Sequence, residues 1–168
     1  MELLLDFVLV GGILITLIIF ILLVKKKNKE LPHNILVIFF LLLLFVSLRF
    51  YAEYHHIQWL YVISFLPEDT IVWFIGPLLM LYIKSLFLDP KNIIVRNLFH
   101  FLPFLLYLVF ISIPVLISIL NGEYALDYLD SLSKRMYLVV IGRGLLLVGY
   151  LWYCLFLFGK YLELIKTN

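Results

Sequence analysis

Long apolar runs, separated by short charged loops, dominate the chain. Five of them approach or exceed the length needed to cross a hydrocarbon core of about 30 Å, which takes roughly 20 helical residues. The runs lack the two-residue alternation that a membrane barrel needs, so we expect each of them to be a helix. The predicted spans cover about 7–24, 34–51, 71–88, 98–120 and 136–159.

A sixth apolar stretch, Ile57–Leu66, is ten residues long and ends at the polar run 67–69. It is too short to cross a bilayer. Its aromatic residues Trp59 and Tyr61 belong to the types that prefer the membrane–water interface. We therefore expect a short interfacial or re-entrant helix here, separate from the third span.

The composition supports the same fold class. Of the 168 residues, 65% are hydrophobic and 14% are charged, whereas a soluble domain carries about 25% charged residues. A soluble chain of this length has no core large enough to hide so much apolar surface. We therefore predict an all-α, polytopic helical membrane protein with about five transmembrane helices plus a short interfacial helix, forming a single bundle over residues 1–168.

The basic residues are sorted between alternate loops. Nine lie on one side of the predicted spans and three on the other. Because basic residues are retained in the cytoplasm, this predicts an external N-terminus and a cytoplasmic C-terminus. The main determinants follow the first span, where we expect them to face anionic lipid rather than nucleic acid. They are Lys25, Lys26, Lys27 and Lys29.

Arg143 is the one charged residue inside the predicted last span, seven residues from its start. Such a guanidinium is costly unless it faces protein, water or an anion. One interpretation is a weak ligand site in which Arg143 contacts an anion or a carboxylate inside the bundle. The other is that Arg143 snorkels to the outer interface or binds loop carbonyls. Gly142 and Gly149, together with Gly11 and Gly12, offer surfaces for close helix packing.

A histidine and several helix-breaking residues also lie within the spans. His100 is the second weak candidate for ligand binding, although a lone histidine near a span end is often an interface residue. Gly76 and Pro77 interrupt the third span, and Pro103 and Pro114 interrupt the fourth. Proline frees backbone carbonyls and kinks a membrane helix, so these four residues are predicted kinks or hinges.

Other chemistry finds little support in the sequence. Glu53 and His56 have the Glu-x-x-His spacing of some metal sites, but the second such pair is missing and we expect no metal. The lone Cys154 excludes a disulfide framework within the chain. The sequence also lacks a phosphate-binding glycine loop and the common hydrolase motifs, so we expect neither an enzyme nor a cofactor.

Two strings resemble a known family. Residues 76–86 read GPLLMLYIKSL, and residues 100–106 read HFLPFLL after a short basic loop. Their order and separation are similar to a signature in the membrane region of bacterial membrane-anchored AraC-type transcriptional regulators. Met80 departs from that pattern, since the family usually has tyrosine at this position.

The resemblance implies a function. Members of the family carry seven or eight membrane helices, then a cytoplasmic domain with two helix-turn-helix units. The chain ends at Asn168, which leaves no room for that domain, so we expect a sensory and anchoring module without DNA-binding output. It would lie in the bacterial inner membrane and bind no nucleic acid itself, and its partners would be lipid and either a second copy or further membrane helices. Alternatives are a small transporter or channel subunit, or an inactive fragment or accessory subunit. The sequence identifies no ligand.

The predicted orientation can be tested by labelling in intact cells. A cysteine placed near Glu123 should react with a membrane-impermeant thiol reagent added outside, and one placed near Lys27 should be protected, because the two loops lie on opposite sides of the membrane. The native Cys154 is first replaced by serine to remove background labelling. The reverse pattern would contradict the orientation.

Overall fold

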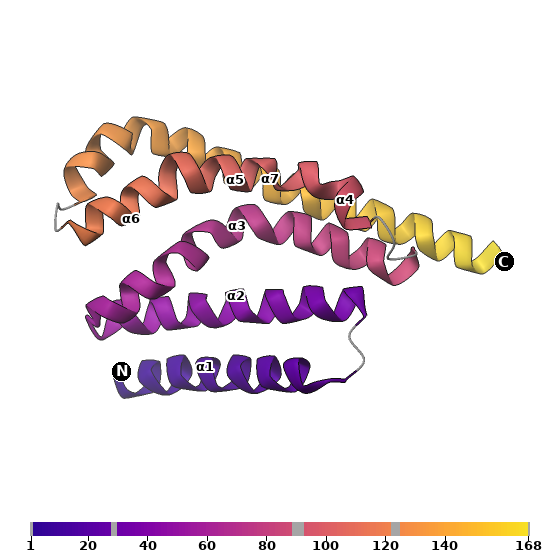
Figure 1. Ribbon diagram of the computed structural model, residues 1–168, viewed down its shortest axis with the longest axis horizontal. Helices are drawn as coiled ribbons and strands as arrows, with labels where there is room; N and C mark the ends of the chain where they lie inside the picture. The colour runs from indigo at the N-terminus through magenta and orange to yellow at the C-terminus, as the bar shows by residue number, and fades with distance from the viewer. Residues whose placement is uncertain (1, 28–29, 89–92, 122–124, 168) are drawn as a thin grey trace. The chain divides into compact units, whose positions relative to one another are not determined.

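The computed structural model describes the backbone of residues 2–27, 30–88, 93–121 and 125–167 and contains no strand in these ranges (Figure 1). Within this part of the chain, five helical segments are long and apolar enough to cross a membrane. The expected all-α, polytopic helical fold is therefore confirmed. The five segments are Leu3–Lys25, Leu31–Tyr54, Gln58–Phe87, Ile93–Leu120 and Ile141–Glu163.

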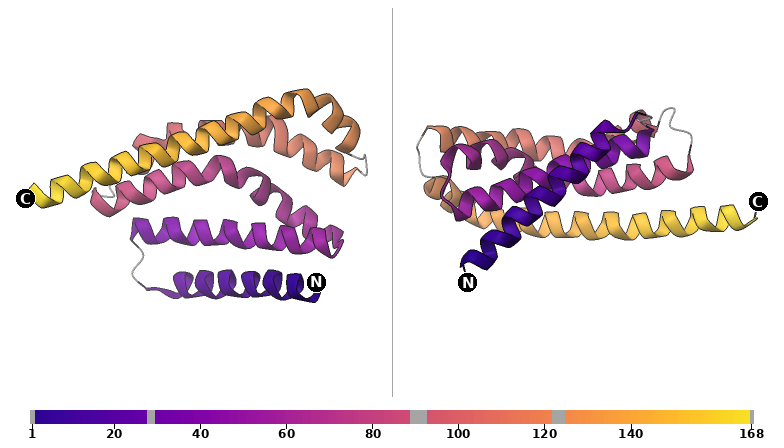
Figure 2. Two further views of the ribbon diagram at one scale, coloured as in Figure 1. Left: turned by 180° about the vertical axis from the view of Figure 1, so that it is seen from behind. Right: turned by 90° about the horizontal axis from the view of Figure 1, so that it is seen from below.

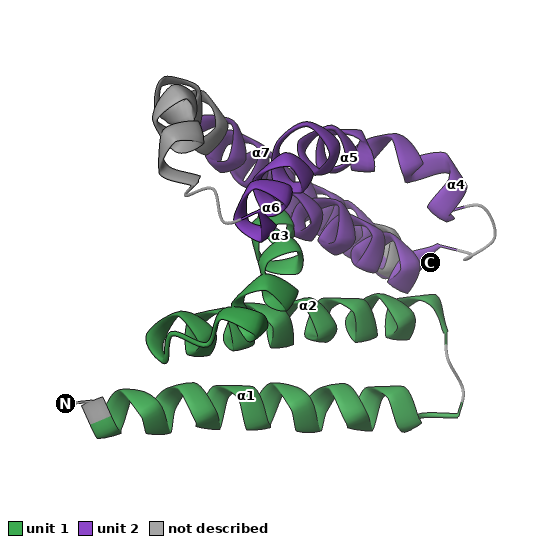
Figure 3. Ribbon diagram, turned by 60° about the vertical axis from the view of Figure 1, so that its left-hand side comes forward, with its two compact units in different colours: residues 1–71 green, residues 72–168 purple. Residues whose placement is uncertain are grey.

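The chain divides into two compact units, residues 1–71 and 72–168 (Figure 3). Helix α3, Gln58–Phe87, contributes its first part to unit 1 and its second part to unit 2. Each unit is described by itself below, and the predicted single bundle over 1–168 stays a prediction.

Unit 1 begins with an antiparallel helix pair, α1 (Glu2–Lys25) and α2 (Leu31–Tyr54), which lie side by side in both views (Figures 1 and 2). Helix α1 is apolar on all sides, and its large side chains point outward, with Leu3 84% and Phe7 79% exposed. Water would not tolerate so much exposed hydrocarbon, whereas lipid tails cover it at no cost. The apolar surface of α1 is thus a lipid-facing surface.

The C-terminal end of α1 is capped by a histidine from α2. A helix leaves its last four carbonyls without backbone partners, and in hydrocarbon each unpaired group is expensive. The buried His33 side chain lies with Nε2 2.6 Å from the Leu23 carbonyl oxygen and donates to it. Sequence patterns did not identify this contact, because His33 and Leu23 belong to different helices.

A tight turn joins α2 to α3. His56 adopts a left-handed backbone conformation with φ 55°, and the amide of Ile57 donates to the Ala52 carbonyl at 2.9 Å. The amide of His56 donates to Glu53 at 3.3 Å. These two bonds make a Schellman motif, which satisfies the last carbonyls of α2 and reverses the chain within a few residues.

The prediction of a separate interfacial helix over Ile57–Leu66 was wrong. This stretch is the first part of α3, which continues without a break through Pro67 to Phe87. The polar run 67–69 does not end the helix, because its acidic side chains tolerate a helical backbone and Glu68 finds a cationic partner on α2. The third span therefore starts well before residue 71.

In unit 2, the fourth span is a chain of short helical segments. Each of its two prolines lies in the first turn of a new α segment, where a missing N–H costs nothing. Pro103 follows a 3₁₀ turn and Pro114 follows a π turn, so the backbone changes register just before each proline. The segments are α4 (Ile93–Asn97), η1 (Leu98–Phe101), α5 (Leu102–Tyr107), η2 (Leu108–Ser112) and α6 (Ile113–Leu120). Their action as hinges stays a prediction, as does that of Pro77, which is fully buried inside α3.

Helix α7, Ala125–Thr167, is longer than the predicted span 136–159 and packs against the rest of unit 2. Aromatic pairs connect its elements. The ring of Phe87 stacks on Tyr161 with centroids 5.0 Å apart, and Phe74 contacts Phe104 at 4.8 Å. Such offset ring contacts add to the burial of apolar surface. They hold the second part of α3 between α7 and the fourth span.

The turn between α2 and α3 predicts that His56→Gly stabilises the protein. A left-handed conformation costs an L-residue about 1–2 kcal/mol, and glycine has no such cost, although it gains freedom in the unfolded chain. We expect a net gain of a few tenths to about 1 kcal/mol in unfolding free energy, measured in mild detergent. His56→Val should lose at least as much, and a stabilised valine variant would contradict the assignment of this turn.

Candidate functional site

Polar side chains among the described residues of unit 2 make contacts between helices. Hydrocarbon offers polar groups no water, so they must find partners within the protein. In this unit the contacts are centred on Arg143, on Tyr150 and on Lys84. Together they form the candidate site.

Arg143 of α7 is directed at an aromatic pair. Its guanidinium donates to the Tyr107 hydroxyl, and its central carbon lies 4.6 Å from the centre of the Tyr107 ring and 6.0 Å from that of Trp73. The two rings are stacked at 5.0 Å. Ring faces attract a cation, most strongly where water is excluded. Arg143 therefore contacts α3 and α5 within its own unit, and its role as a ligand site stays a prediction.

His100 meets Tyr150 of α7. Its Nδ1 lies 2.9 Å from the Tyr150 hydroxyl oxygen, and that hydroxyl also lies 3.4 Å from the His100 carbonyl oxygen. Pro103 has no N–H with which to continue the 3₁₀ pattern onto this carbonyl. The tyrosine hydroxyl is thus placed where the proline leaves an acceptor, and it ties the irregular part of the fourth span to α7.

Gly76 makes room for the same tyrosine. A Cβ atom at position 76 would lie 2.7 Å from the ring of Tyr150 and 2.9 Å from the Cβ atom of Tyr150. This is too close for any side chain. The glycine is therefore required for packing, a role distinct from the predicted kink. By contrast, Gly11, Gly12 and Gly149, which the sequence offered for close packing, meet nothing within 4 Å.

Lys84 joins α3 to α4. Its ammonium donates to the side-chain oxygen of Asn97 at 2.6 Å, and the Asn97 amide donates to the Ile93 carbonyl at 2.7 Å. Tyr153 of α7 places its ring centre 5.7 Å from the ammonium. Asn97 is buried, so this amide works as a fixed bridge between the cation and the backbone of α4.

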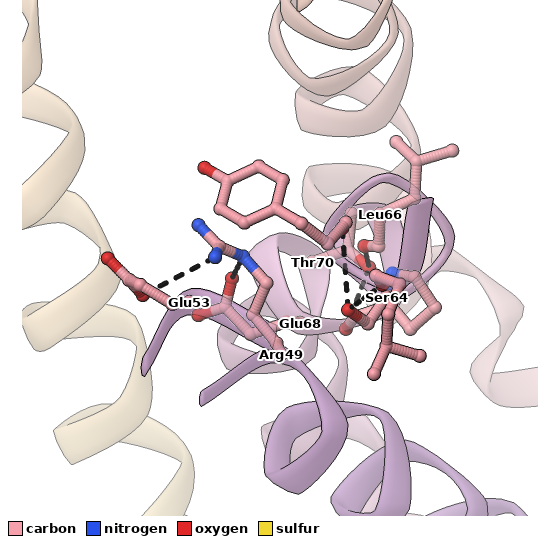
Figure 4. Close-up of polar contacts among 9 residues, drawn as sticks. Arg49, Glu53, Ser64, Leu66, Glu68 and Thr70 are labelled. Atoms are coloured by element: carbon pink, nitrogen blue, oxygen red, sulfur yellow. Dashed lines mark hydrogen bonds and ion pairs between the residues drawn. The ribbon is translucent and has the colours of Figure 1, made fainter. Parts of the chain in front are cut away.

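A further charged cluster lies in unit 1, around Arg49 of α2 (Figure 4). The guanidinium lies 3.3 Å from Glu53 and 3.9 Å from Glu68, with Tyr61 beneath it at 3.2 Å from the ring centre. Its side chain is only 11% exposed. Arg49 thereby connects α2 to the first part of α3. Arg49 lies near the end of the predicted span 34–51, and Glu53 at i+4 is a sequence signal for an ion pair within one helix.

The hydroxyls near this cluster bond to their own helix. Ser64 donates to Leu60 and Thr70 donates to Leu66, each at 2.6 Å (Figure 4). Such bonds back to the i−4 carbonyl satisfy a buried hydroxyl without a partner from another helix. These two hydroxyls therefore stabilise the helix to which they belong.

The remaining predicted residues do not join these contacts. Lys25, Lys26 and Lys27 are exposed, and Lys29 lies outside the described residues. Cys154 is a free, buried thiol. Among the described residues, no group of three or more His, Cys, Asp or Glu side chains could hold a metal ion.

Comparison with family models, with curated proteins and with solved structures finds no match to this chain. The resemblance of residues 76–86 and 100–106 thus rests on the strings themselves. The structure adds that Gly76, Lys84 and His100, which belong to these strings, each contact another element of unit 2.

The packing of Gly76 predicts a large effect of a single methyl group. In Gly76→Ala the new Cβ clashes with the base of the Tyr150 side chain, so α3 and α7 must separate, which we expect to cost about 1–3 kcal/mol of unfolding free energy. Gly149→Ala is the matched control and should be neutral or stabilising by up to about 1 kcal/mol, because its Cβ meets open space. Thermal unfolding in mild detergent measures both. Equal effects of the two variants would contradict the close approach at Gly76.

Proposed function

We propose that this chain is the membrane-embedded sensory and anchoring module of a transmembrane transcriptional regulator. It crosses the bacterial inner membrane with its N-terminus outside and its C-terminus in the cytoplasm. Its environment is the lipid bilayer, and its surface is completed by a second copy or by further membrane helices. The module passes a change at the outer side to an output domain in the cytoplasm.

One observation carries the proposal. Three residues of the two family-like strings contact other elements: Gly76 and His100 converge on Tyr150, and Lys84 binds Asn97. A string that served only to fill a membrane span would need apolar residues, and it would not need a glycine, a histidine and a lysine that contact other elements. The strings instead define how α3, the fourth span and α7 pack together in unit 2.

Such packing suits a two-state element. Tyr150 is held by two hydroxyl contacts with His100 and by its close approach to Gly76, next to the register change before Pro103. A stimulus that favours a different packing of α7 on this face shifts the population between two states, and α7 ends at Thr167 on the side where the output domain is expected.

The proposal predicts a signalling effect of Tyr150→Phe. We consider the full chain fused at its C-terminus to a DNA-binding domain that acts only as a dimer, with a reporter gene as readout. Removing the hydroxyl abolishes both contacts with His100 and keeps the ring against Gly76. A lost hydrogen bond of about 1 kcal/mol changes the ratio of two states about five-fold, so reporter output should change by up to that factor.

Tyr153→Phe is the matched control, because it removes a hydroxyl from the next turn of α7 and keeps the ring near Lys84. Its reporter output should equal that of the unchanged chain. Membrane levels of all three proteins are compared by immunoblot. If Tyr150→Phe is correctly inserted and leaves the output unchanged, the sensory proposal fails and a transporter or accessory subunit becomes the better reading.

A further inference from the structure

Two basic side chains of unit 2 lie at neighbouring span ends. Lys84 is in the last turn of α3, and Arg96 is in α4, at the start of the fourth span. Each of them is within about one helical turn of the end of its span. That depth is the boundary between hydrocarbon and headgroups, where a bilayer carries its phosphates.

The ammonium of Lys84 is held in place and keeps donors for a ligand. Its Nζ donates to the side-chain oxygen of the buried Asn97 at 2.6 Å, and the ring centre of Tyr153 lies 5.7 Å away. An ammonium has three donors, of which this bond uses one. Asn97 directly follows Arg96, which lies close enough to Lys84 for the two positive charges to interact.

The basic pair of Lys84 and Arg96 has no acidic counterpart in the part of the chain that the structure describes. None of the described carboxylates forms an ion pair with either residue, and Arg96 is exposed and makes no hydrogen bond through its side chain there. Two like charges repel each other, and each is costly beside hydrocarbon. An anion bound between them would relieve both costs.

Apolar side chains surround Arg96 on the same stretch of chain. Val95 is 77% exposed, Leu98 62% and Phe99 81%. A small soluble anion would leave these side chains uncovered, whereas the acyl chains of a lipid cover them. A ligand with a negatively charged head and apolar chains therefore matches both the basic pair and its surroundings.

We propose that Lys84 and Arg96 form a binding site for the phosphate of an anionic lipid, whose acyl chains lie against Val95, Leu98 and Phe99. The planar guanidinium offers paired donors that fit two phosphate oxygens, and the ammonium acts as a point charge. A lipid bound here connects α3 to α4 and so stabilises their packing. The site is independent of the sensory function proposed above.

The site is tested on the purified full-length chain in micelles of a mild non-ionic detergent. Phosphatidylglycerol is the anionic probe, and phosphatidylcholine is the zwitterionic one. A ligand that binds only the folded protein raises its unfolding midpoint. We expect phosphatidylglycerol to raise the midpoint by about 3–6 °C at about ten times its dissociation constant, and phosphatidylcholine to leave it nearly unchanged. Equal shifts with both lipids would overturn the site.

Arg96→Gln is the variant of choice, because Lys84→Gln would also break the bond to Asn97. In detergent alone Arg96→Gln should be at least as stable as the unchanged chain, since it removes one of two like charges. With phosphatidylglycerol it should lose at least half of the shift in midpoint. An Arg96→Gln variant that keeps the whole shift would overturn the site.

Lys27→Gln is the matched control. It removes one positive charge from an exposed residue of unit 1 and leaves the basic pair unchanged. The variant should keep the full shift with phosphatidylglycerol. If it loses as much of the shift as Arg96→Gln does, the lipid responds to total charge, and the assignment to Lys84 and Arg96 is overturned.

Glycerol phosphate tests the source of the phosphate. It has the phosphate chemistry of a headgroup and lacks acyl chains, so at the concentration used for phosphatidylglycerol it should leave the midpoint unchanged. A shift equal to that with phosphatidylglycerol would overturn the lipid assignment in favour of a soluble phosphate ester.

Discussion

The absence of water in the hydrocarbon core is the constraint on which this structure depends. A charged side chain at the centre of a span costs about 2.5–3.5 kcal/mol on insertion scales, so charges there need partners from the protein. Arg49 has two carboxylates and an aromatic face, Arg143 has an aromatic pair, and Lys84 has a buried amide. Apart from Arg49 with Glu53, which lies within α2, each of these contacts joins different helices. Because a charge in the membrane needs a protein partner, these pairs favour particular arrangements of the helices.

The same constraint governs the backbone. Proline removes a donor, and in lipid the acceptor left behind must be satisfied. In the fourth span, Pro103 and Pro114 occupy first turns of new segments, where the donor is not needed, and a hydroxyl from α7 lies beside the His100 carbonyl. In the turn at His56, the last carbonyls of α2 accept hydrogen bonds from backbone amides of the turn itself. At these two places, the His100 carbonyl and the end of α2, irregular backbone is tolerated because the freed groups have nearby partners.

These contacts are found in both units. In unit 1, α1 packs along α2, and the side chains of His33 and His55 contact it near its two ends. In unit 2, Tyr150 is the point at which a glycine and a histidine from two other elements meet. A packing point that depends on few contacts is a feature that a small change in free energy can shift.

The sequence by itself determined the fold class and the approximate position of all five spans, because bilayer thickness fixes the length of an apolar run independently of its neighbours. It also located Arg143, His100, Gly76 and the prolines as unusual residues within these spans, since each breaks an otherwise apolar pattern. It failed at Ile57–Leu66, where a proline and two acidic residues resembled a helix end. Composition could not show that Glu68 would meet a cation from α2.

Only the tertiary structure decided what the unusual residues contact. Gly76 resembled a kink in the sequence and is a packing site, because Tyr150, 74 residues later, occupies the space of its missing side chain. Asp6 with His55, His100 with Tyr150 and Arg143 with Tyr107 are likewise far apart in the chain. Helical periodicity relates residues three or four positions apart on one helix. Contacts between helices depend on how the helices are rotated and shifted against one another, and in chains that are apolar on every side no hydrophobic stripe fixes that rotation.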